Sequence, residues 1–403
     1  DPLAYRMTAM TLPSDRLEGW ELRLASKDGP AREWPSGSTQ PGTQEVFSSV
    51  ESTARSQVVP EQHFLPPTAL ASGSSRSPVP PEQRRLAVRA RDAQWSISRG
   101  DLTLDQELSH TLHSTLYLSS WKGMTVVVKC AGPPEKRSST WAGQAGPSPD
   151  QTSENKAATD SMVQELLHEI EMMSCLRHPD VLMFLGAALD SGSPVMCVTE
   201  YMPHGDLERY YQRQRRRRDS CAWRPPLVDV VEWCLALARG LHFLHSRDAP
   251  VVHRDLKPMN LFLTSTLQLK LGDLGSCTRL ESGGCLRTKG VVGTWRYMAP
   301  EVVRREEYNE KVDIYAFGLV MYFMSSGRMP FHQYGLDPKA ILDDHFRGLR
   351  PRPRIGDCYP ALRPLMVAAW HEVYQRRPSA QELLGLLSNG QSQKAPGCGC
   401  ALM

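Results

Sequence analysis

The stretch HRDLKPMN at residues 253–260 decides the fold of this chain. Two shorter motifs follow it in order, DLG at 273–275 and APE at 299–301. An HRD triplet alone arises easily by chance, but the three motifs in this order do not. Together they indicate one site that is assembled from three successive segments.

The order and spacing of these motifs resemble those of eukaryotic protein kinases. The resemblance covers residues 93–388 and implies an α+β, two-lobed protein kinase fold, with a small β-rich lobe that holds one helix and a larger, mainly helical lobe. The apolar pattern agrees with this. TVVVK (125–129) runs apolar as a strand does, SMVQELLHEIEMMSCL (161–176) has helical spacing, and the apolar runs after Leu227 are mostly helical.

The motif residues suit transfer of the ATP γ-phosphate to a protein hydroxyl, which is the activity that the resemblance implies. This reaction needs an oriented hydroxyl, groups held in line and neutralised phosphate charge. Asp255 would accept the proton of the substrate hydroxyl, and Lys257 would stabilise the transferring phosphoryl group. Asn260 and Asp273 would hold Mg²⁺, which prefers carboxylate, amide and phosphate oxygens.

A second lysine and its acidic partner are implied upstream. VVVK resembles the strand whose lysine contacts the α- and β-phosphates, which selects Lys129. LHEIEMMSCLRHPDVLMFLGA resembles the corresponding stretch of the tyrosine-kinase-like group, including Raf-like kinases, and there the partner carboxylate falls on Glu169. Glu165 and Glu171 are the alternatives, because helix surfaces carry acidic side chains routinely.

The same resemblance implies contacts with the adenine base. Residues 195–201 look like the strand that leads into the hinge, with Thr199 guarding the adenine pocket. The carbonyl of Glu200 and the amide of Met202 would receive adenine, since backbone groups are rigid and supply both a donor and an acceptor. The further side chains implied for the nucleotide pocket are Leu108, Leu116 and Val127.

The loop over the phosphates departs from the family pattern. Its three glycine positions hold Ser109, Thr111 and Ser114, although glycine lets the backbone approach phosphates closely and adopt unusual angles. Val127 also narrows the adenine pocket, where alanine is usual. Two interpretations follow: an active kinase with weakened nucleotide binding, or a pseudokinase that acts as a scaffold or switch. Activity is favoured by the retained Lys129, Glu169, Asp255, Asn260 and Asp273.

Two features favour serine and threonine over tyrosine as the acceptor. Lys257, and Thr294 within GTWRYMAPE, resemble the pattern of serine/threonine kinases. Thr288 lies between DLG and APE, and a phosphate there could pair with Arg254 and order the segment. The alternative is that Thr288 is only solvated, like most loop hydroxyls.

Structural pairs are implied for the C-terminal lobe. Asp313 resembles the buried helix residue that holds the catalytic-loop backbone, and Arg377 would pair with Glu301. Removing one partner of such a buried pair is costly. Leu274 replaces the usual Phe after the metal-binding Asp, and we expect it to pack under Met173.

The flanking segments differ from this domain in composition. Residues 1–92 and the insertion at 132–160 are rich in Ser, Pro and Gly and are predicted to be disordered, and residues 389–403 form a polar tail. The 403 residues include 47 Lys and Arg against 44 Asp and Glu, a net charge of +3 that argues against nucleic acid as a partner. No apolar run is long enough for a membrane span, and ten scattered cysteines without a CxxC pair favour a reducing compartment.

The tail ends in CALM, which resembles a C-a-a-X prenylation box. The final Met suggests farnesyl at Cys400, palmitoyl at Cys398 would add a second anchor, and the arginines of 213–218 could attract an anionic leaflet. These features predict a serine/threonine kinase at the cytoplasmic face of membranes, with ATP and protein substrates as partners. For the arginine run alone, a solvated loop or a nuclear-localisation signal is the alternative. For the whole chain, the alternative function is that of a membrane-tethered adaptor for which the fold is only a binding surface.

Overall fold

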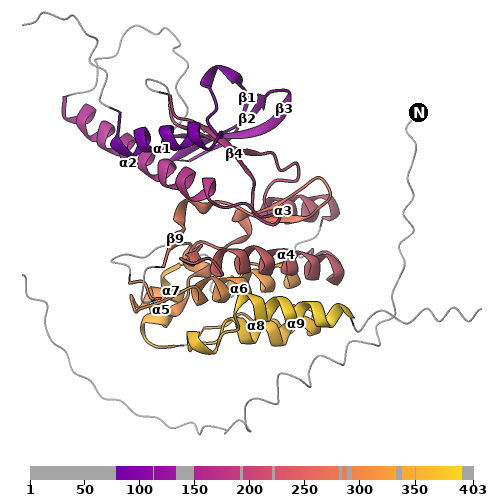
Figure 1. The fold of residues 1–403 in the computed structure, drawn as a ribbon. Coiled ribbons are helices and arrows are strands. Elements are labelled where there is room, and N and C mark those ends of the chain that lie inside the picture. The colour runs from indigo at the N-terminus through magenta and orange to yellow at the C-terminus, as the bar shows by residue number, and fades with distance from the viewer. Residues whose placement is uncertain are drawn as a thin grey trace, which may run out of the picture. The chain divides into compact units, whose positions relative to one another are not determined.

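The computed structural model describes residues 79–111, 113–132, 149–190, 194–219, 223–280, 284–287, 293–332, 338–349 and 351–392. A five-stranded sheet with two helices, α1 (Pro81–Asp92) and α2 (Pro149–Ser174), comes first in the chain, and a mainly helical part follows (Figure 1). This arrangement confirms the predicted α+β fold with a small β-rich lobe and a larger helical lobe.

The strands of the sheet, in chain order, are β1 (Leu102–His110), β2 (Ser114–Trp121), β3 (Met124–Ala131), β4 (Phe184–Ala188) and β5 (Met196–Glu200). They lie in the order β1-β2-β3-β5-β4, and all neighbours are antiparallel. The β-branched run in β3 favours a strand because Val side chains pack well on a pleated surface. Val126 and Val128 are buried in a small core on one face of the sheet, so Val127 and Lys129 lie on the other face.

Helix α2 presents the predicted apolar face. Leu166, Ile170 and Met173 are buried, and Met162 is half-buried. The helix begins at Pro149, so residues 149–160 of the stretch predicted to be disordered are helical instead. Proline suits the first turn of a helix, and the residues after it include the good helix formers Ala, Glu and Lys.

Helix α1 is a correction to the prediction that all of residues 1–92 are disordered. Leu86 and Ala90 are buried in the same core as α2, which α1 contacts. The buried Gln83 donates from Nε2 to the carbonyl of Leu189 at 3.3 Å. Half of the residues in PEQRRLAVRARD are charged, so its helix is stabilised by packing on α2 rather than by a wide apolar stripe.

The helices of the larger lobe are α3 (Leu207–Arg218), α4 (Leu227–His245), α5 (Pro300–Val303), α6 (Lys311–Ser326), α7 (Pro338–Phe346), α8 (Arg363–Ala369) and α9 (Ala380–Ser392). Residues 312–326 of α6 are all buried, as expected of a helix that is apolar on every side. Helices α4 and α8 contact α6, and α9 contacts α4. Because α9 ends at Ser392, the folded domain extends beyond the predicted end at 388.

Two short ladders support the motif segments. Strand β6 (Val251–Val252) pairs with β9 (Thr278–Arg279), and β7 (Leu261–Leu263) pairs with β8 (Leu269–Leu271). The first ladder joins the chain just before HRDLKPMN to the chain just after DLG, and the second joins the chain just after HRDLKPMN to the chain just before DLG. Within the described part of the chain, no helix is both long and apolar enough to cross a bilayer.

The predicted ion pair between Arg377 and Glu301 is present. The guanidinium donates to both carboxylate oxygens, at 2.6 and 2.8 Å, and the two side chains are 0% and 3% exposed. Arg377 also donates to the carbonyls of His371 and Lys311 at 2.7 and 3.0 Å. Such a bidentate contact gives both the buried guanidinium and the buried carboxylate a hydrogen-bonded partner of opposite charge.

Candidate active site

The HRDLKPMN segment is held by a buried carboxylate on α6. The backbone amides of His253 and Arg254 donate to the two oxygens of Asp313 at 2.8 and 2.9 Å, and His245 Nε2 lies 2.9 Å from Oδ2. Burial alone would raise the pKa of Asp313, but the hydrogen bond and charge of His245, with the contribution of His253, lower it. The expected role of Asp313 is therefore present, and it fixes Arg254 at a φ of +67°.

Asp255 takes part in a closed set of hydrogen bonds. Lys257 Nζ donates to Asp255 Oδ2 at 2.6 Å and to Thr294 Oγ1 at 2.9 Å. Thr294 donates to Asp255 Oδ1 from its hydroxyl at 2.8 Å and from its amide at 2.9 Å. Gly293 has a φ of +101°, and a Cβ there would meet the carbonyl oxygen of Arg254 at 2.5 Å. The close approach of these two segments orients Asp255 as an acceptor.

Asn260 is oriented by the same residue. Its Nδ2 donates to the carbonyl oxygen of Asp255 at 2.8 Å and to Oδ2 at 3.3 Å, and the side chain is buried. Because both donor contacts go to Asp255, the amide oxygen is the atom that remains for a metal ion. That oxygen and the carboxylate of Asp273 are of the type that Mg²⁺ prefers, so the two residues fit the predicted donor set.

Lys129 lies between two carboxylates. Its Nζ is 2.7 Å from Glu169 Oε2 and 3.7 Å from Asp273 Oδ1. Burial alone would lower the pKa of Lys129, but the charges of both carboxylates raise it above its ordinary value. Burial would raise the pKa of Asp273, and the charges of Lys129, His253 and Lys257 lower it instead. The site therefore favours a charged lysine beside a charged Asp273.

The structure distinguishes the three candidate acids on α2. Glu169 is 6% exposed and reaches Lys129. The Oε2 atom of Glu165 lies 3.2 Å from Nδ1 of His113, a residue in the turn between β1 and β2, and Glu171 is exposed. Of the three, only Glu169 lies on the buried face of the helix.

The DLG motif forms a sharp turn between β8 and β9. Asp273 has a φ of +57°, and a short 3₁₀ helix, η4 (Leu274–Ser276), follows it. Leu274 is fully buried in the same core cluster as Met173, and α2 contacts η4. An apolar residue therefore fills the position where Phe is usual, as the sequence predicts.

The residues predicted for the nucleotide pocket come from four strands and the hinge. Thr199 of β5 is paired with Val127 of β3, and both are half-buried. Leu116 of β2 is half-buried, Leu108 of β1 is exposed and Met202 is buried. Leu116 is paired with Lys129 of β3, and the exposed Leu108 lies at a register shift of β1, between the residues that pair with Tyr117 and Leu116.

Two contacts at this site were not predicted from the sequence. Glu200 accepts hydrogen bonds from Lys270 Nζ and from the amide of Met183, both at 2.7 Å, which fixes the start of the hinge. His168 Nε2 lies 2.9 Å from the carbonyl oxygen of Cys277 and joins α2 to the segment after DLG. Both contacts connect residues far apart in the chain, so no local pattern indicates them.

The connection between β1 and β2 uses a hydroxyl to close its own turn. Thr111 Oγ1 accepts from the amides of His113 and Ser114 at 3.2 and 3.1 Å, and the Thr111 amide donates to the carbonyl of Ser114 at 2.8 Å. Ser109 lies within β1, opposite Leu116. Two amides of the loop are therefore occupied by the threonine that stands where glycine is usual.

The residues predicted for regulation and membrane attachment are only partly described. Arg254 donates from Nε to the carbonyl of Ser276 at 2.7 Å, at the start of the segment between DLG and APE. Thr288, Cys398 and Cys400 lie outside the described residues.

The arginine run is helical, whereas a solvated loop was one prediction for it. It forms the last turns of α3, and Arg213 and Arg215 donate to the carbonyls of His204 and Gly327. The three arginines at 216–218 are exposed.

Known proteins are similar in sequence to this chain. A family model described as protein kinase domain matches residues 150–386, more than half of the chain. Serine/threonine-protein kinase VIK of Arabidopsis thaliana is 35% identical over 230 residues, which are 55% of this chain and 50% of that protein. Serine/threonine/tyrosine-protein kinase HT1 of the same plant is 29% identical over 75% of this chain and 69% of its own length. Dual specificity protein kinase shkE of Dictyostelium discoideum is 35% identical over 56% of this chain and 30% of its own length. The chain thus spans about half the length of VIK.

Proposed function

The chain belongs to the protein kinase family, and from this premise we propose that it is an active serine/threonine kinase that transfers the ATP γ-phosphate to protein hydroxyl groups. One observation carries the proposal: Lys129 meets Glu169 and Asp273 in the same conformation in which Asp255 is bound to Lys257. This combination of contacts supports a phosphotransfer site in which both groups of residues act together. The similarity to VIK, HT1 and shkE, which are named as protein kinases, supports the same reaction.

In the proposed reaction, Asp255 accepts a hydrogen bond from the substrate hydroxyl and takes its proton as the new bond to phosphorus forms. Lys257, 2.6 Å from Asp255, supplies a positive charge beside the transferring phosphoryl group. Lys129, held by Glu169, supplies another at the α- and β-phosphates. Fixed charges of this kind are usually the largest single contribution to catalysis.

Asn260 and Asp273 would hold the metal ion that kinases use. When bound, Mg²⁺ neutralises charge on the phosphates. Asp255 holds the Asn260 amide by its nitrogen, which leaves the oxygen for the ion. The lowered pKa of Asp273 keeps its carboxylate ionised near neutral pH.

Serine and threonine are the proposed acceptors because of the contact between Lys257 and Thr294. The lysine donates to the Thr294 hydroxyl at 2.9 Å, and that hydroxyl donates to Asp255. This set positions the lysine next to the proposed base, as the resemblance to serine/threonine kinases implies. Assignment to the tyrosine-kinase-like group rests on the stretch around Glu169 and is likewise proposed.

The experiment that tests the proposal compares two carboxylates. Asp255→Asn should remove phosphotransfer to a generic protein substrate while ATP binding persists. Asp273→Asn should remove Mg²⁺-dependent nucleotide binding as well. Asp105→Asn, at an exposed position of β1, is the control and should change neither. Phosphotransfer that persists in purified Asp255→Asn protein would contradict the assignment of the base.

A pseudokinase scaffold or switch is the second candidate, and the loop between β1 and β2 favours it. The amides of His113 and Ser114 are bound by Thr111 and are not free to bind phosphate. A measurement of ATP affinity with and without Mg²⁺ separates the two candidates. Binding that depends on Mg²⁺, together with turnover, supports the active kinase, and no binding in either condition supports the scaffold.

We propose that a chain ending at Met403 is farnesylated at Cys400 and acylated at Cys398, and so is tethered to the cytoplasmic face of membranes. One lipid gives marginal binding and a second makes it stable. Cys400→Ser should move the protein to the soluble fraction, and Cys398→Ser should release part of it. An unmodified tail peptide from a prenylating cell, seen by mass spectrometry, would refute the modification.

We also propose that phosphate on Thr288 is bound by Arg254. The guanidinium already contacts the backbone of Ser276, so it lies at the start of the segment it would order. Thr288→Ala and Arg254→Ala should lower activity equally and not additively if the two act as a pair. Additive losses of activity in the double variant would show that the two residues act independently.

A further inference from the structure

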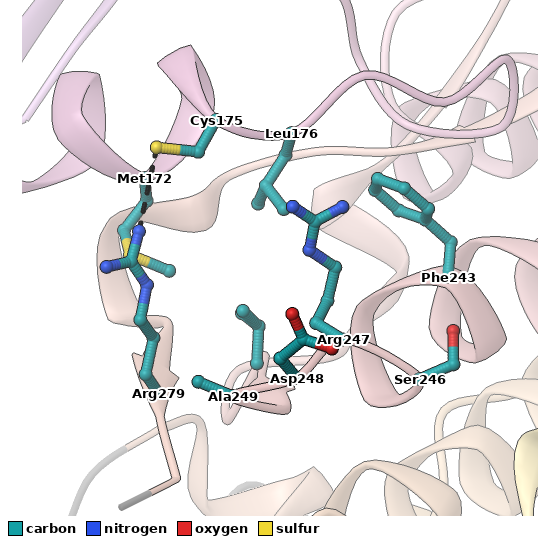
Figure 2. A pocket seen from close by; sticks show the side chains of 10 residues that line it. Met172, Cys175, Leu176, Phe243, Ser246, Arg247, Asp248, Ala249 and Arg279 are labelled. Atoms are coloured by element: carbon teal, nitrogen blue, oxygen red, sulfur yellow. Dashed lines mark hydrogen bonds between the residues drawn. The ribbon is translucent and has the colours of Figure 1, made fainter.

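A cavity of about 450 Å³ lies beside the end of α2 (Figure 2), and the residues that line it include none of those proposed for phosphotransfer. Cys175 and Arg279 lie on one side of it and Arg247 on the other (Figure 2). Asp248 is the one acidic residue among those that line it. A volume of this size is typical of sites for small molecules.

The thiol of Cys175 lies between two guanidinium groups that belong to different elements. Arg89 of α1 donates to Sγ at 2.7 Å, and Arg279 of β9 donates at 3.6 Å. Sγ also lies 3.4 Å from the carbonyl oxygen of Glu171 and 3.9 Å from Ser174 Oγ. Partial burial alone would raise the pKa of the thiol, but the hydrogen bond and charge of Arg89, with Ser174 and the charge of Arg279, lower it.

The other described cysteines have different surroundings. Cys285 is exposed, and the rest are buried: Cys130, Cys197, Cys234, Cys277 and Cys358. Burial raises the pKa of Cys358 to about 11. Because the thiolate is the form that attacks a disulfide, Cys175 combines solvent access with a stabilised nucleophile.

Arg247 gives the cavity a site for an anion. Its guanidinium is exposed, lies 5.3 Å from the centre of the Phe243 ring, and makes no hydrogen bond or ion pair with the residues that the structure describes. With Arg279 it outweighs the charge of Asp248. Guanidinium groups bind carboxylates through paired hydrogen bonds, so Arg247 can receive a carboxylate of a molecule attached at Cys175.

We propose that Cys175 is a modification site for small disulfides that carry carboxylates, and that the cavity holds the attached half. In this reaction the Cys175 thiolate attacks one sulfur of the disulfide. A bond forms between Sγ and that sulfur, the original S–S bond breaks, and the other half leaves as a thiolate that takes a proton from water. The disulfide is the oxidant, so no other redox partner is needed.

The test uses the full chain and does not depend on phosphotransfer, so it can fail or succeed independently of the proposed function. The probes are oxidised glutathione, which carries carboxylates, and 2-hydroxyethyl disulfide, which is neutral. Mass spectrometry of proteolytic peptides measures the adduct at each cysteine. We expect Cys175 to react with oxidised glutathione several times faster than Cys285 near neutral pH, because the arginines beside Cys175 lower the pKa of its thiol and Arg247 can receive a carboxylate of the probe. We also expect a smaller ratio with the neutral probe.

Three variants separate the causes. Arg89→Ala should move the pH midpoint of iodoacetamide labelling at Cys175 upward, whereas Arg89→Lys, which keeps the charge, should move it less. Arg247→Ala should slow the reaction with oxidised glutathione and leave iodoacetamide labelling unchanged. Equal rates at Cys175 and Cys285, an unchanged midpoint in Arg89→Ala, or no preference for the anionic probe would overturn the proposal.

Discussion

Replacing Arg377 by Met removes the charged partner of a buried carboxylate. Glu301 would keep its negative charge with none of the two hydrogen bonds that now satisfy it. The carbonyl groups of His371 and Lys311 would lose the donors that now lie 2.7 and 3.0 Å away. Methionine fills a similar volume, so the effect reports the uncompensated charge rather than an empty space.

The expected cost is large because neither side chain is exposed to water. The exposed fractions are 0% for Arg377 and 3% for Glu301, and removing one partner of such a pair costs about 3–5 kcal/mol. For a domain of this size, each kcal/mol corresponds to about 2–4 °C in Tm, so we expect a decrease of roughly 6–20 °C. Replacing both residues by apolar ones should cost less than the single change, since no charge is then left buried.

Thermal unfolding followed by circular dichroism measures this effect. The control is Arg304→Met, which removes an equally short contact of 2.7 Å to Glu306 in a more exposed place, where the side chains are 22% and 50% exposed. It should cost at most about 1 kcal/mol. If Arg377→Met and Arg304→Met lower the Tm equally, burial is not what gives the first pair its importance, and the reasoning fails.

Three further predictions follow from other parts of the fold. Glycine at all three hydroxyl positions of the β1–β2 hairpin, Ser109, Thr111 and Ser114, should tighten ATP binding because it frees backbone amides. Calorimetry measures the affinity, and an unchanged value would show that the hydroxyls already contact the phosphates. Leu86→Ala should loosen α1 by about 2 kcal/mol and speed amide hydrogen exchange there, and protection equal to wild type would show that α1 does not depend on this contact. Asp313 has a lowered pKa in the folded protein, so its stabilising contribution is present above the ordinary Asp value of 3.8 and is lost as the pH falls below it. Urea unfolding at several pH values should therefore show a smaller acid-induced loss of stability in Asp313→Asn than in wild type.

Sequence motifs predicted those parts of the site whose spacing along the chain is set by one strand or one helix. Lys129 and Glu169 were selected by their resemblance to a kinase strand and helix, and the structure places Glu169, rather than Glu165 or Glu171, on the buried face of α2. Asp313 and the pair of Arg377 with Glu301 could be named because each lies in a distinctive segment. The distances between these residues and the burial of their side chains could not be predicted from the sequence.

The features that the sequence did not predict depend on tertiary contacts or on a side chain bonding to its own backbone. Helix α1 has too few apolar residues for its sequence to predict a helix. Its Leu86 is buried only because α2 packs beside it in the folded protein. The bond from Lys270 to Glu200 joins two strands that are far apart in the chain. The Thr111 hydroxyl could equally have faced phosphate, and only the conformation of the turn shows that it binds neighbouring amides.

The family match begins at residue 150, but the sheet begins at Leu102, and this difference decides where the chain can be cut. A recombinant fragment that starts at 150 would lack three of the five strands and leave β5 with an unpaired edge, which invites aggregation. A fragment that starts at 93 would keep the sheet but uncover the surface of α2 that Leu86 and Ala90 now shield. Truncations intended for crystallisation or inhibitor screening should therefore begin no later than Val79, because a later start would lower their solubility by exposing surface that is buried in the folded domain.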